Sequence, residues 1–366
     1  MAQEFVPGLQ LAREFYVTAV HPLIEQRFPR LPYAAALLGR GSEVAGFDSQ
    51  RSTDHDWGPR LQVFLGDNDA DRYAGAVTAM LATQLPTSFR GYPVAFPVTK
   101  EPGGQARHRV EVIGLGARLT SRLGFDPRQT VTLLDWLATP AQRLAEFTGG
   151  EVFYDGPGEL SRARGILAWY PDDVWLYLLA CQWQRIGQEE PFPGRCAEAG
   201  DELGSIIVTA RLARNLVRLC LLMHQRYPPY SKWLGTAFAR LPGSDRLAAS
   251  LAAAISAADG WPAREQHLCD AYAAVAALHN QLGLTCPLDP RTRPFYNRPY
   301  QVIGGDRFAA ALRETIADPR IRRLPATGAI DQFADSTDAA GDLGFVRACA
   351  GAAISQAAAP ADPACL

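Results

Sequence analysis

The first part of the chain alternates between the spacings of apolar residues that are typical of helices and of strands. Apolar residues recur at steps of three and four over residues 9–28, which predicts a helix that ends at Pro29. Residues 69–85 predict a second helix. Strands are predicted at residues 33–38, 54–64 and 107–114. We expect an interruption of the middle strand at Pro59, because proline cannot donate a hydrogen bond to a central ladder.

After residue 115 the pattern becomes helical. Residues 149–158 carry glycines at both ends and are typical of a last strand followed by a turn, which places a domain boundary near residue 157. The predicted helices span residues 130–137, 172–186, 196–227, 232–240, 246–258, 261–282, 306–317 and 341–356. We therefore predict an α+β protein, with its strands in residues 1–157 and an all-helical domain in residues 158–366.

Length and charge agree with two domains and limit the class of partner. A single core rarely grows past about 250 to 300 residues, and this chain has 366. Its hydrophobic content of 48% and charged content of 20% are ordinary for a globular protein, and the formal net charge of -2 gives no basic field. Nucleic acid is therefore not an expected partner.

Cysteine spacing and hydropathy limit which metal sites and which cellular compartment we expect. Seven cysteines are widely scattered, with no Cys-x-x-Cys and no histidine at metal-finger spacing, so no zinc site is expected. The amino terminus lacks a signal segment, and no run approaches the roughly 18 apolar residues of a membrane span. We expect a cytoplasmic protein with reduced thiols and no membrane partner.

Two sets of side chains in the helical part allow a functional or a structural interpretation. Arg211, Arg214 and Arg218 repeat along one predicted helix, either as a local basic surface or, as such stripes more often do, as a solvated face. A second set falls at helical spacing, which favours packing over a ligand cage: Trp175, Leu178, Leu179 and Gln182.

The chemistry is concentrated in two aspartates that stand one residue apart. In an extended strand Asp54 and Asp56 leave the same face, whereas His55 points the other way and is expected to pack into the sheet. Two parallel carboxylates suit Mg²⁺, which binds one or two carboxylates together with waters and substrate phosphates. A Gly41-Ser42 turn lies upstream, separated from Asp54 by residues 43–53. Such a turn can bring phosphate close to the backbone.

Residues 37–47 and 52–56, taken together, resemble the signature of the polymerase-beta-like nucleotidyltransferase superfamily. The shared elements are a strand before Gly-Ser, a second glycine a few residues later, and an Asp-x-Asp strand after a short loop. The resemblance implies a small mixed sheet flanked by helices, with Gly41 and Ser42 holding the triphosphate and Asp54 and Asp56 the metals. The chain departs from the pattern where Trp57-Gly58-Pro59 replaces aliphatic residues.

The same family uses a third carboxylate on a neighbouring strand. Glu111 lies between Val110 and Val112 in the predicted strand at residues 107–114, and the resemblance makes it the third ligand of a site that holds two Mg²⁺ ions. By itself such a glutamate is more often a solvent-facing acid on an edge strand.

The remaining candidate site residues follow from charge and position. Lys232, one of two lysines in the chain, opens a predicted helix and is the candidate for binding the β- and γ-phosphates, as a lysine of the helical lobe does in small-molecule nucleotidyltransferases. Arg51 and Arg60 flank the acidic strand as further phosphate ligands. Two acidic pairs, which contain Glu190 and Glu202, are candidates for the general base, although such pairs are more often solvated helix ends. Glu111 itself is a further candidate.

Together these residues predict a Mg²⁺-dependent nucleotidyltransferase. The expected reaction moves a nucleoside monophosphate from a nucleoside triphosphate, with ATP expected, to a hydroxyl group of a small molecule and releases pyrophosphate. The resemblance favours relatives of the aminoglycoside and lincosamide enzymes, which modify antibiotics. The alternatives are a protein adenylyltransferase, an RNA-end nucleotidyltransferase, and an inactive nucleotide-binding regulatory protein.

Overall fold

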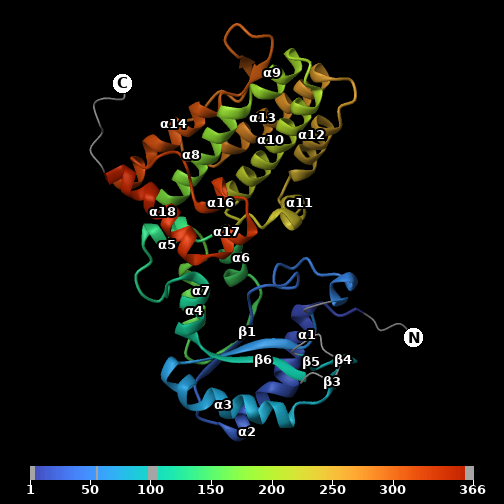
Figure 1. The fold of residues 1–366 in the computed structure, drawn as a ribbon, viewed down its shortest axis with the longest axis vertical. Coiled ribbons are helices and arrows are strands. Elements are labelled where there is room, and N and C mark those ends of the chain that lie inside the picture. Colours follow the sequence, from blue (N-terminus) through green and yellow to red (C-terminus); the bar gives the residue numbers. More distant parts are fainter. Residues whose placement is uncertain (1–4, 55–56, 98–105, 359–366) are drawn as a thin grey trace. The chain divides into compact units, whose positions relative to one another are not determined.

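The computed structural model describes residues 5–54, 57–97 and 106–358. The chain divides into two compact units (Figure 1). The first unit comprises residues 1–135 and 143–168, and the second comprises residues 136–142 and 169–366. The boundary predicted near residue 157 falls inside the first unit, in the turn after its last strand.

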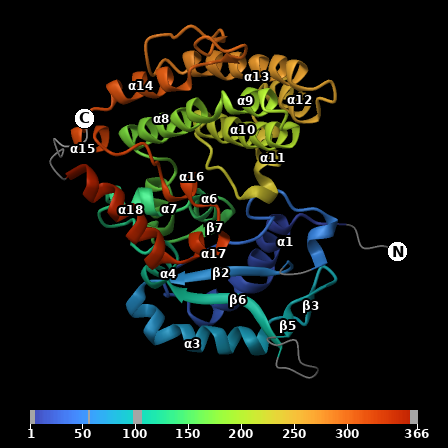
Figure 2. The same ribbon diagram turned by 45° about the horizontal axis from the view of Figure 1, so that its top comes forward.

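The first unit contains a five-stranded mixed sheet with the strand order β5-β6-β2-β1-β7. The strands are β1 (Tyr33–Leu37), β2 (Arg60–Leu65), β5 (Ala95–Pro97), β6 (Ala106–Gly114) and β7 (Glu151–Asp155). β2 and β6 run parallel, and the other pairs are antiparallel. β2 and β6 lie side by side (Figure 2). A mixed sheet combined with many helices confirms the predicted α+β class.

Helices cover one face of this sheet. The predicted helix at residues 9–28 is realised as α1 (Gly8–Phe15), a π-helical turn η1 (Tyr16–Val20) and α2 (His21–Arg27). These elements and α3 (Asp67–Gln84) bury apolar side chains against alternate residues of the central strands. Members of this core include Phe15, Ile24, Tyr33, Ala35, Leu61, Val63, Val77, Leu81 and Val110.

The opposite face becomes accessible toward β6. β1 is buried along its whole length, and its small residue Ala36 lies on that opposite face. Next to Ala36 in the ladder is Gln62 on β2, and next to Gln62 is Glu111 on β6. Glu111 is half exposed, which leaves a polar group at the accessible side of the sheet.

The strand predicted at residues 54–64 is wrong in its first half. Residues Gln50–Asp54 form a short 3₁₀ helix, η2, and β2 begins only at Arg60. Gly58 has φ of +134°, and Pro59 follows it, so the backbone before Arg60 cannot continue a regular ladder. His55 and Asp56 lie outside the described residues, so their predicted orientation on a strand stays a prediction.

The second unit is built mainly from helices and, unlike the all-helical domain predicted, also contains a short antiparallel pair of strands, β8 (Arg293–Pro294) and β9 (Gln301–Val302). Its helices include α8 (Asp172–Glu189), α9 (Phe192–Glu198), α10 (Glu202–Met223), α11 (Ser231–Ala239), α12 (Ser244–Ser256), α13 (Trp261–Gln281), α14 (Gly305–Thr315) and α18 (Leu343–Ala358). Shorter helices α15 (Pro319–Arg322), α16 (Ile330–Phe333) and α17 (Thr337–Gly341) complete its carboxyl-terminal part. The rings of Trp183 on α8 and Phe308 on α14 stack with centroids 4.3 Å apart. Among the helices of the described residues, none is long and apolar enough to cross a membrane.

The helix predicted at residues 196–227 is divided into α9 and α10. Gly200 has φ of +73°, and the side chain of Asp201 accepts a hydrogen bond from the backbone N–H of Gly204. This interaction caps the amino terminus of α10 and therefore starts a new helix. The packing predicted for Trp175, Leu178, Leu179 and Gln182 is confirmed, because all of them are buried.

Candidate functional site

The Gly41-Ser42 turn begins four residues after the end of β1 and leaves no space for a side chain at Gly41. Gly41 has φ of +142°, and a Cβ atom at this position would collide with the side chains of Glu43 and Arg60. The turn closes through a hydrogen bond of 2.7 Å from the N–H of Phe47 to the carbonyl oxygen of Ser42. Only glycine therefore suits this position.

A buried ion pair fixes the turn to the start of β2. The Nε and Nη2 atoms of Arg60 donate hydrogen bonds of 2.8 and 2.5 Å to Oε1 of Glu43, whose side chain is only 3% exposed. Nη2 of Arg60 also donates to the carbonyl oxygen of Arg40 at 2.6 Å. Arg60, which the sequence suggests as a phosphate ligand, is thus engaged by the turn itself. Glu43 was missed, because nothing in its spacing reveals a partner on another element.

Gln62 fixes the residue before the turn. Its Oε1 accepts a hydrogen bond of 2.9 Å from the N–H of Leu38, and its Nε2 donates one of 3.2 Å to the carbonyl oxygen of Leu38. Gln62 stands opposite Glu111 in the parallel register of β2 and β6. The turn and Glu111 are therefore both positioned by the same strand.

Glu111 lies on a strand, as predicted, and forms an ion pair with Arg118 of α4 (Leu115–Leu123). The Glu111 side chain is 50% exposed, whereas that of Arg118 is 14% exposed. Burial, together with the charge of Arg122, lowers the pKa of Arg118. A cation that bound to the carboxylate of Glu111 would displace the guanidinium of Arg118 or share the carboxylate with it.

The segment that carries the aspartates is held at both ends. Oδ2 of Asp48 accepts hydrogen bonds from the backbone N–H of Gly8 at 2.7 Å and from Nε1 of Trp57 at 3.3 Å. Trp57 is buried, and its ring meets that of Tyr92 edge to face at 4.9 Å. A side chain on Gly8 would collide with Trp57. These contacts anchor the loop on α1, so its path depends on tertiary structure.

Asp54 ends the 3₁₀ helix η2, and Arg51 is an exposed residue of the same helix. Asp56 lies outside the described residues. Among the residues that the structure does describe, no group of three His, Cys, Asp or Glu side chains is placed to hold a metal ion. The predicted ligand set of Asp54, Asp56 and Glu111 consequently stays a prediction.

Lys232 is exposed near the amino terminus of α11, with its Nζ atom 4.8 Å from the ring centroid of Trp233. The backbone N–H of Tyr230, just before this helix, donates a hydrogen bond of 3.0 Å to Oε1 of Gln142. Gln142 is the residue after which the chain passes from the second unit back into the first. The helix that carries Lys232 is therefore tied to a crossing point of the chain.

The two predicted bases have partners in the second unit. The carboxylate of Glu190 accepts hydrogen bonds from the backbone N–H groups of Ile303, Gly304 and Gly305 at 2.6 to 3.1 Å. Burial outweighs these donors and raises the pKa of Glu190 to about 7. Glu202 pairs with the fully buried Arg264, whose hydrogen bond lowers the pKa of Glu202. Glu190 thus supports the start of α14, and Glu202 keeps a half-exposed side chain.

The arginine stripe of α10 faces acidic partners. Arg211 pairs with Glu189, Arg214 with Asp335 and Arg218 with Asp331, at 2.7, 2.8 and 2.6 Å respectively. The stripe is therefore neutralised by α8 and by the chain around α16.

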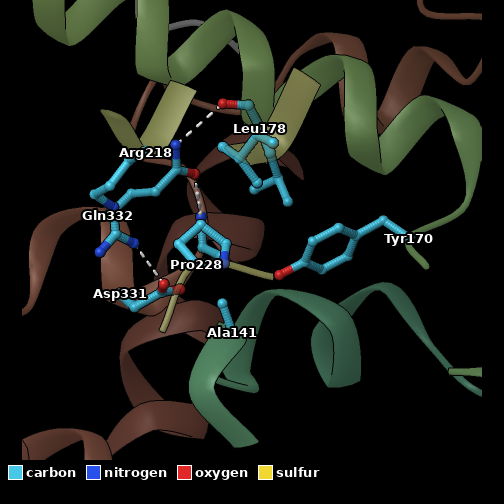
Figure 3. Close-up of a pocket in the computed structure, with 9 residues that line it drawn as sticks. Ala141, Tyr170, Leu178, Arg218, Pro228, Asp331 and Gln332 are labelled. Atoms are coloured by element: carbon cyan, nitrogen blue, oxygen red, sulfur yellow. Dashed lines mark hydrogen bonds and ion pairs between the residues drawn. The ribbon is translucent and has the colours of Figure 1, made fainter. Parts of the chain in front are cut away.

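The last of these ion pairs borders a small cavity of about 10 Å³. Figure 3 shows Arg218 bonded to Asp331, and Gln332 bonded to the carbonyl oxygen of Leu178, beside this space. A cavity of this size holds about one water molecule, so a substrate does not fit there.

Comparisons with known proteins add the following. Residues 136–234 match a family described as a domain of unknown function (DUF4037). No curated protein matches the chain. A solved structure described as a nucleotidyltransferase-like protein from Exiguobacterium sibiricum 255-15 is 13% identical to the chain, with a TM-score of 0.31. That likeness covers 75% of this chain and 74% of the other.

Proposed function

We propose that the protein is a Mg²⁺-dependent nucleotidyltransferase whose first unit binds the nucleoside triphosphate. The reaction transfers a nucleoside monophosphate, with ATP as the expected donor, to a hydroxyl group of a small molecule. The observation that carries the proposal is the Gly41-Ser42 turn, which has no space for a side chain and is fixed by Arg60 and Gln62 to the strand beside Glu111. Backbone N–H groups of such a turn suit phosphate oxygens.

The donors for a metal are carboxylates, which is the chemistry that Mg²⁺ requires. Glu111 fits this role because its side chain is half exposed and already balances one positive charge. Asp54 and Asp56 would complete the set. When bound, Mg²⁺ offsets the negative charge that develops on the phosphate oxygens.

The chain's own residues supply binding and proton transfer. Ser42 and the backbone of the turn bind phosphate, while Arg51 of the same unit contacts the β- and γ-phosphates of the leaving group. Of the two bases predicted in the helical part, Glu202 keeps an accessible carboxylate, whereas Glu190 is enclosed by backbone donors. Within the first unit, Glu111 is the residue proposed to take the proton of the acceptor hydroxyl.

Among the other functions, modification of RNA ends has the least support. It calls for a free basic surface, yet each arginine of the α10 stripe is paired with an acid. The experiment described next distinguishes the proposed function from transfer to a protein and from nucleotide binding without turnover.

The deciding experiment measures Mg²⁺-dependent release of pyrophosphate from each of the four nucleoside triphosphates. The purified protein is assayed with a small-molecule extract and, separately, with a protein extract. Asp54→Asn is the inactive variant, and Asp71→Asn, an exposed aspartate of α3, is its matched control. Release that requires the small-molecule extract and disappears only in Asp54→Asn supports the proposal. Equal activity of the two variants contradicts the metal assignment.

A further inference from the structure

The accessible face of the sheet in the first unit carries an excess of positive charge. Successive residues of a strand point to opposite faces. Val110 of β6 lies in the core beneath the helices, so Arg109 and Glu111 point to the accessible face. Arg107 and Arg60 point the same way, because the first lies two residues before Arg109 and the second stands beside it in the ladder. On β2 and β6 this face therefore carries three arginines and a single acid, although the whole chain has a formal net charge of -2. Such a surface attracts an anion.

The charge of Arg60 is already balanced by an acid of the fold. Glu43 accepts two hydrogen bonds from its guanidinium, at 2.8 and 2.5 Å. In the same way Arg118 balances the charge of Glu111. Arg60 therefore holds the Gly41-Ser42 turn in place, and a different cation of this face is needed to contact a bound anion.

Arg109 is held by an aromatic ring. Its Cζ atom lies 3.8 Å from the centroid of the Phe96 ring, and both side chains are partly buried. Phe96 stands on β5, which pairs with β6 on the side away from β2. The N–H groups of a guanidinium lie in its plane, so a ring against one face leaves them directed sideways. The stack thereby orients the donors of Arg109 before a ligand arrives.

The ring of Phe96 reaches toward the start of β2. A Cβ atom on Gly58, two residues before Arg60, would lie 3.1 Å from Cζ of this ring. The glycine therefore leaves the space that the ring needs. The stacked pair of Phe96 and Arg109 thus lies at the end of the sheet where β2 begins. Arg60 joins this same end to the carbonyl oxygen of Arg40, just before the Gly41-Ser42 turn.

We propose that Arg109 binds the terminal phosphates of the nucleoside triphosphate. The assignment rests on the proposed function and extends it by naming a second phosphate-binding cation of the first unit, besides Arg51. A guanidinium binds phosphate oxygens through two parallel N–H donors. Because Phe96 fixes its plane, Arg109 loses little conformational freedom when it binds. Its donors lie on the same face as Glu111, two residues along the strand.

The test measures binding to the full-length protein by calorimetry in the presence of Mg²⁺. The probes are AMP and an ATP analogue with a methylene group between its α- and β-phosphorus atoms, which prevents transfer. Arg109→Gln should weaken binding of the analogue by about tenfold or more, because a charge-assisted pair of hydrogen bonds is lost. AMP has no terminal phosphates and should bind as before. Phe96→Leu should weaken the analogue about three- to fivefold, whereas Phe96→Tyr keeps a ring and should not.

Arg72→Gln is the matched control. Arg72 is exposed on α3, which covers the opposite face of the sheet, so the change removes the same charge without altering this face. It should change neither affinity. Equal weakening by Arg72→Gln, an equal loss of AMP binding, or unchanged binding of the analogue to Arg109→Gln would overturn the role of Arg109 alone.

Failure of the unaltered protein to bind the analogue would overturn the proposed function as well. Circular dichroism reports whether each variant is folded. If Arg109→Gln is not, the comparison of Phe96→Leu with Phe96→Tyr decides, because equal affinities of these two variants for the analogue would remove the stacked pair from the phosphate site.

Discussion

Arg60 and Glu43 form a buried ion pair that joins the first residue of β2 to the turn after β1. The side chains are 16% and 3% exposed. The pair also reaches the carbonyl oxygen of Arg40. Because the charges are removed from water, each depends on the other, and the loss of one leaves an uncompensated charge inside the fold.

Arg60→Met is therefore expected to destabilise the protein by about 3 kcal/mol, since removing one partner of a buried pair costs about 3 to 5 kcal/mol. The double variant Arg60→Met with Glu43→Gln should recover part of that loss, because no charge is then left unpaired. Urea unfolding at pH 7 measures both. A double variant that is less stable than the single one would show that the ion pair is not the cause.

Gly41→Ala should impair the binding of the nucleoside triphosphate. The change forces a side chain into the space of Arg60 and Glu43 at φ of +142°, and strain of this kind costs about 1 to 3 kcal/mol. We expect a KM for the nucleotide that is raised at least tenfold. Gly75→Ala is the control, because nothing surrounds that exposed position of α3, and alanine there should stabilise the helix by about 1 kcal/mol. A normal KM in Gly41→Ala would remove the turn from the phosphate site.

Arg118→Gln should lower the concentration of Mg²⁺ that half-saturates activity. The guanidinium of Arg118 occupies the carboxylate of Glu111, so a bound cation competes with it, and its removal should reduce the Mg²⁺ requirement about three- to tenfold. The measurement is pyrophosphate release against Mg²⁺ concentration. Glu111→Gln should act in the opposite direction and lower kcat about a hundredfold. An unchanged Mg²⁺ requirement in both variants would exclude Glu111 as a ligand.

Because of Glu190, the free energy of unfolding should depend on pH between the pKa of this carboxyl group in the unfolded protein and its pKa in the folded protein. Burial raises its pKa from 4.5 to about 7 in the folded protein, so the folded state binds a proton more tightly than the unfolded state does. The resulting stabilisation is complete below pH 4.5 and is lost as pH rises through 7; the raised pKa corresponds to about 3 kcal/mol.

Urea unfolding from pH 4.5 to pH 8 checks this expectation. The free energy of unfolding should decline more steeply in the unaltered protein than in Glu190→Gln, which cannot titrate. Parallel curves for the two proteins would mean that the backbone donors at residues 303–305, rather than burial, control this carboxylate.

Local patterns predicted much of the fold. The strand predicted at residues 33–38 and the helix predicted at residues 69–85 are confirmed, as β1, a continuous apolar run, and α3. The strand at residues 54–64 was wrong in its first half, where Gly58 and Pro59 interrupt the ladder and Trp57 packs against Tyr92 and bonds to Asp48. Those contacts come from distant segments, so periodicity alone does not reveal them.

The candidate site was predictable only in part, for the same reason. The chemistry of the glycine and of the acidic residues was predicted from their identity and spacing. Glu43 and Gln62 act through hydrogen bonds to partners 17 and 24 residues away, and an isolated polar residue gives no sign of such a partner. Glu190 was expected at a solvated helix end, yet its carboxylate is buried and accepts hydrogen bonds from backbone N–H groups of residues 303–305.

The order in which the chain enters and leaves the two units limits how recombination could separate them. It passes from one unit to the other after residues 135, 142 and 168. The seven residues 136–142 therefore belong to the second unit, although segments of the first unit precede and follow them. A single recombination joint after residue 168 would therefore carry the whole first unit but leave the second unit without residues 136–142.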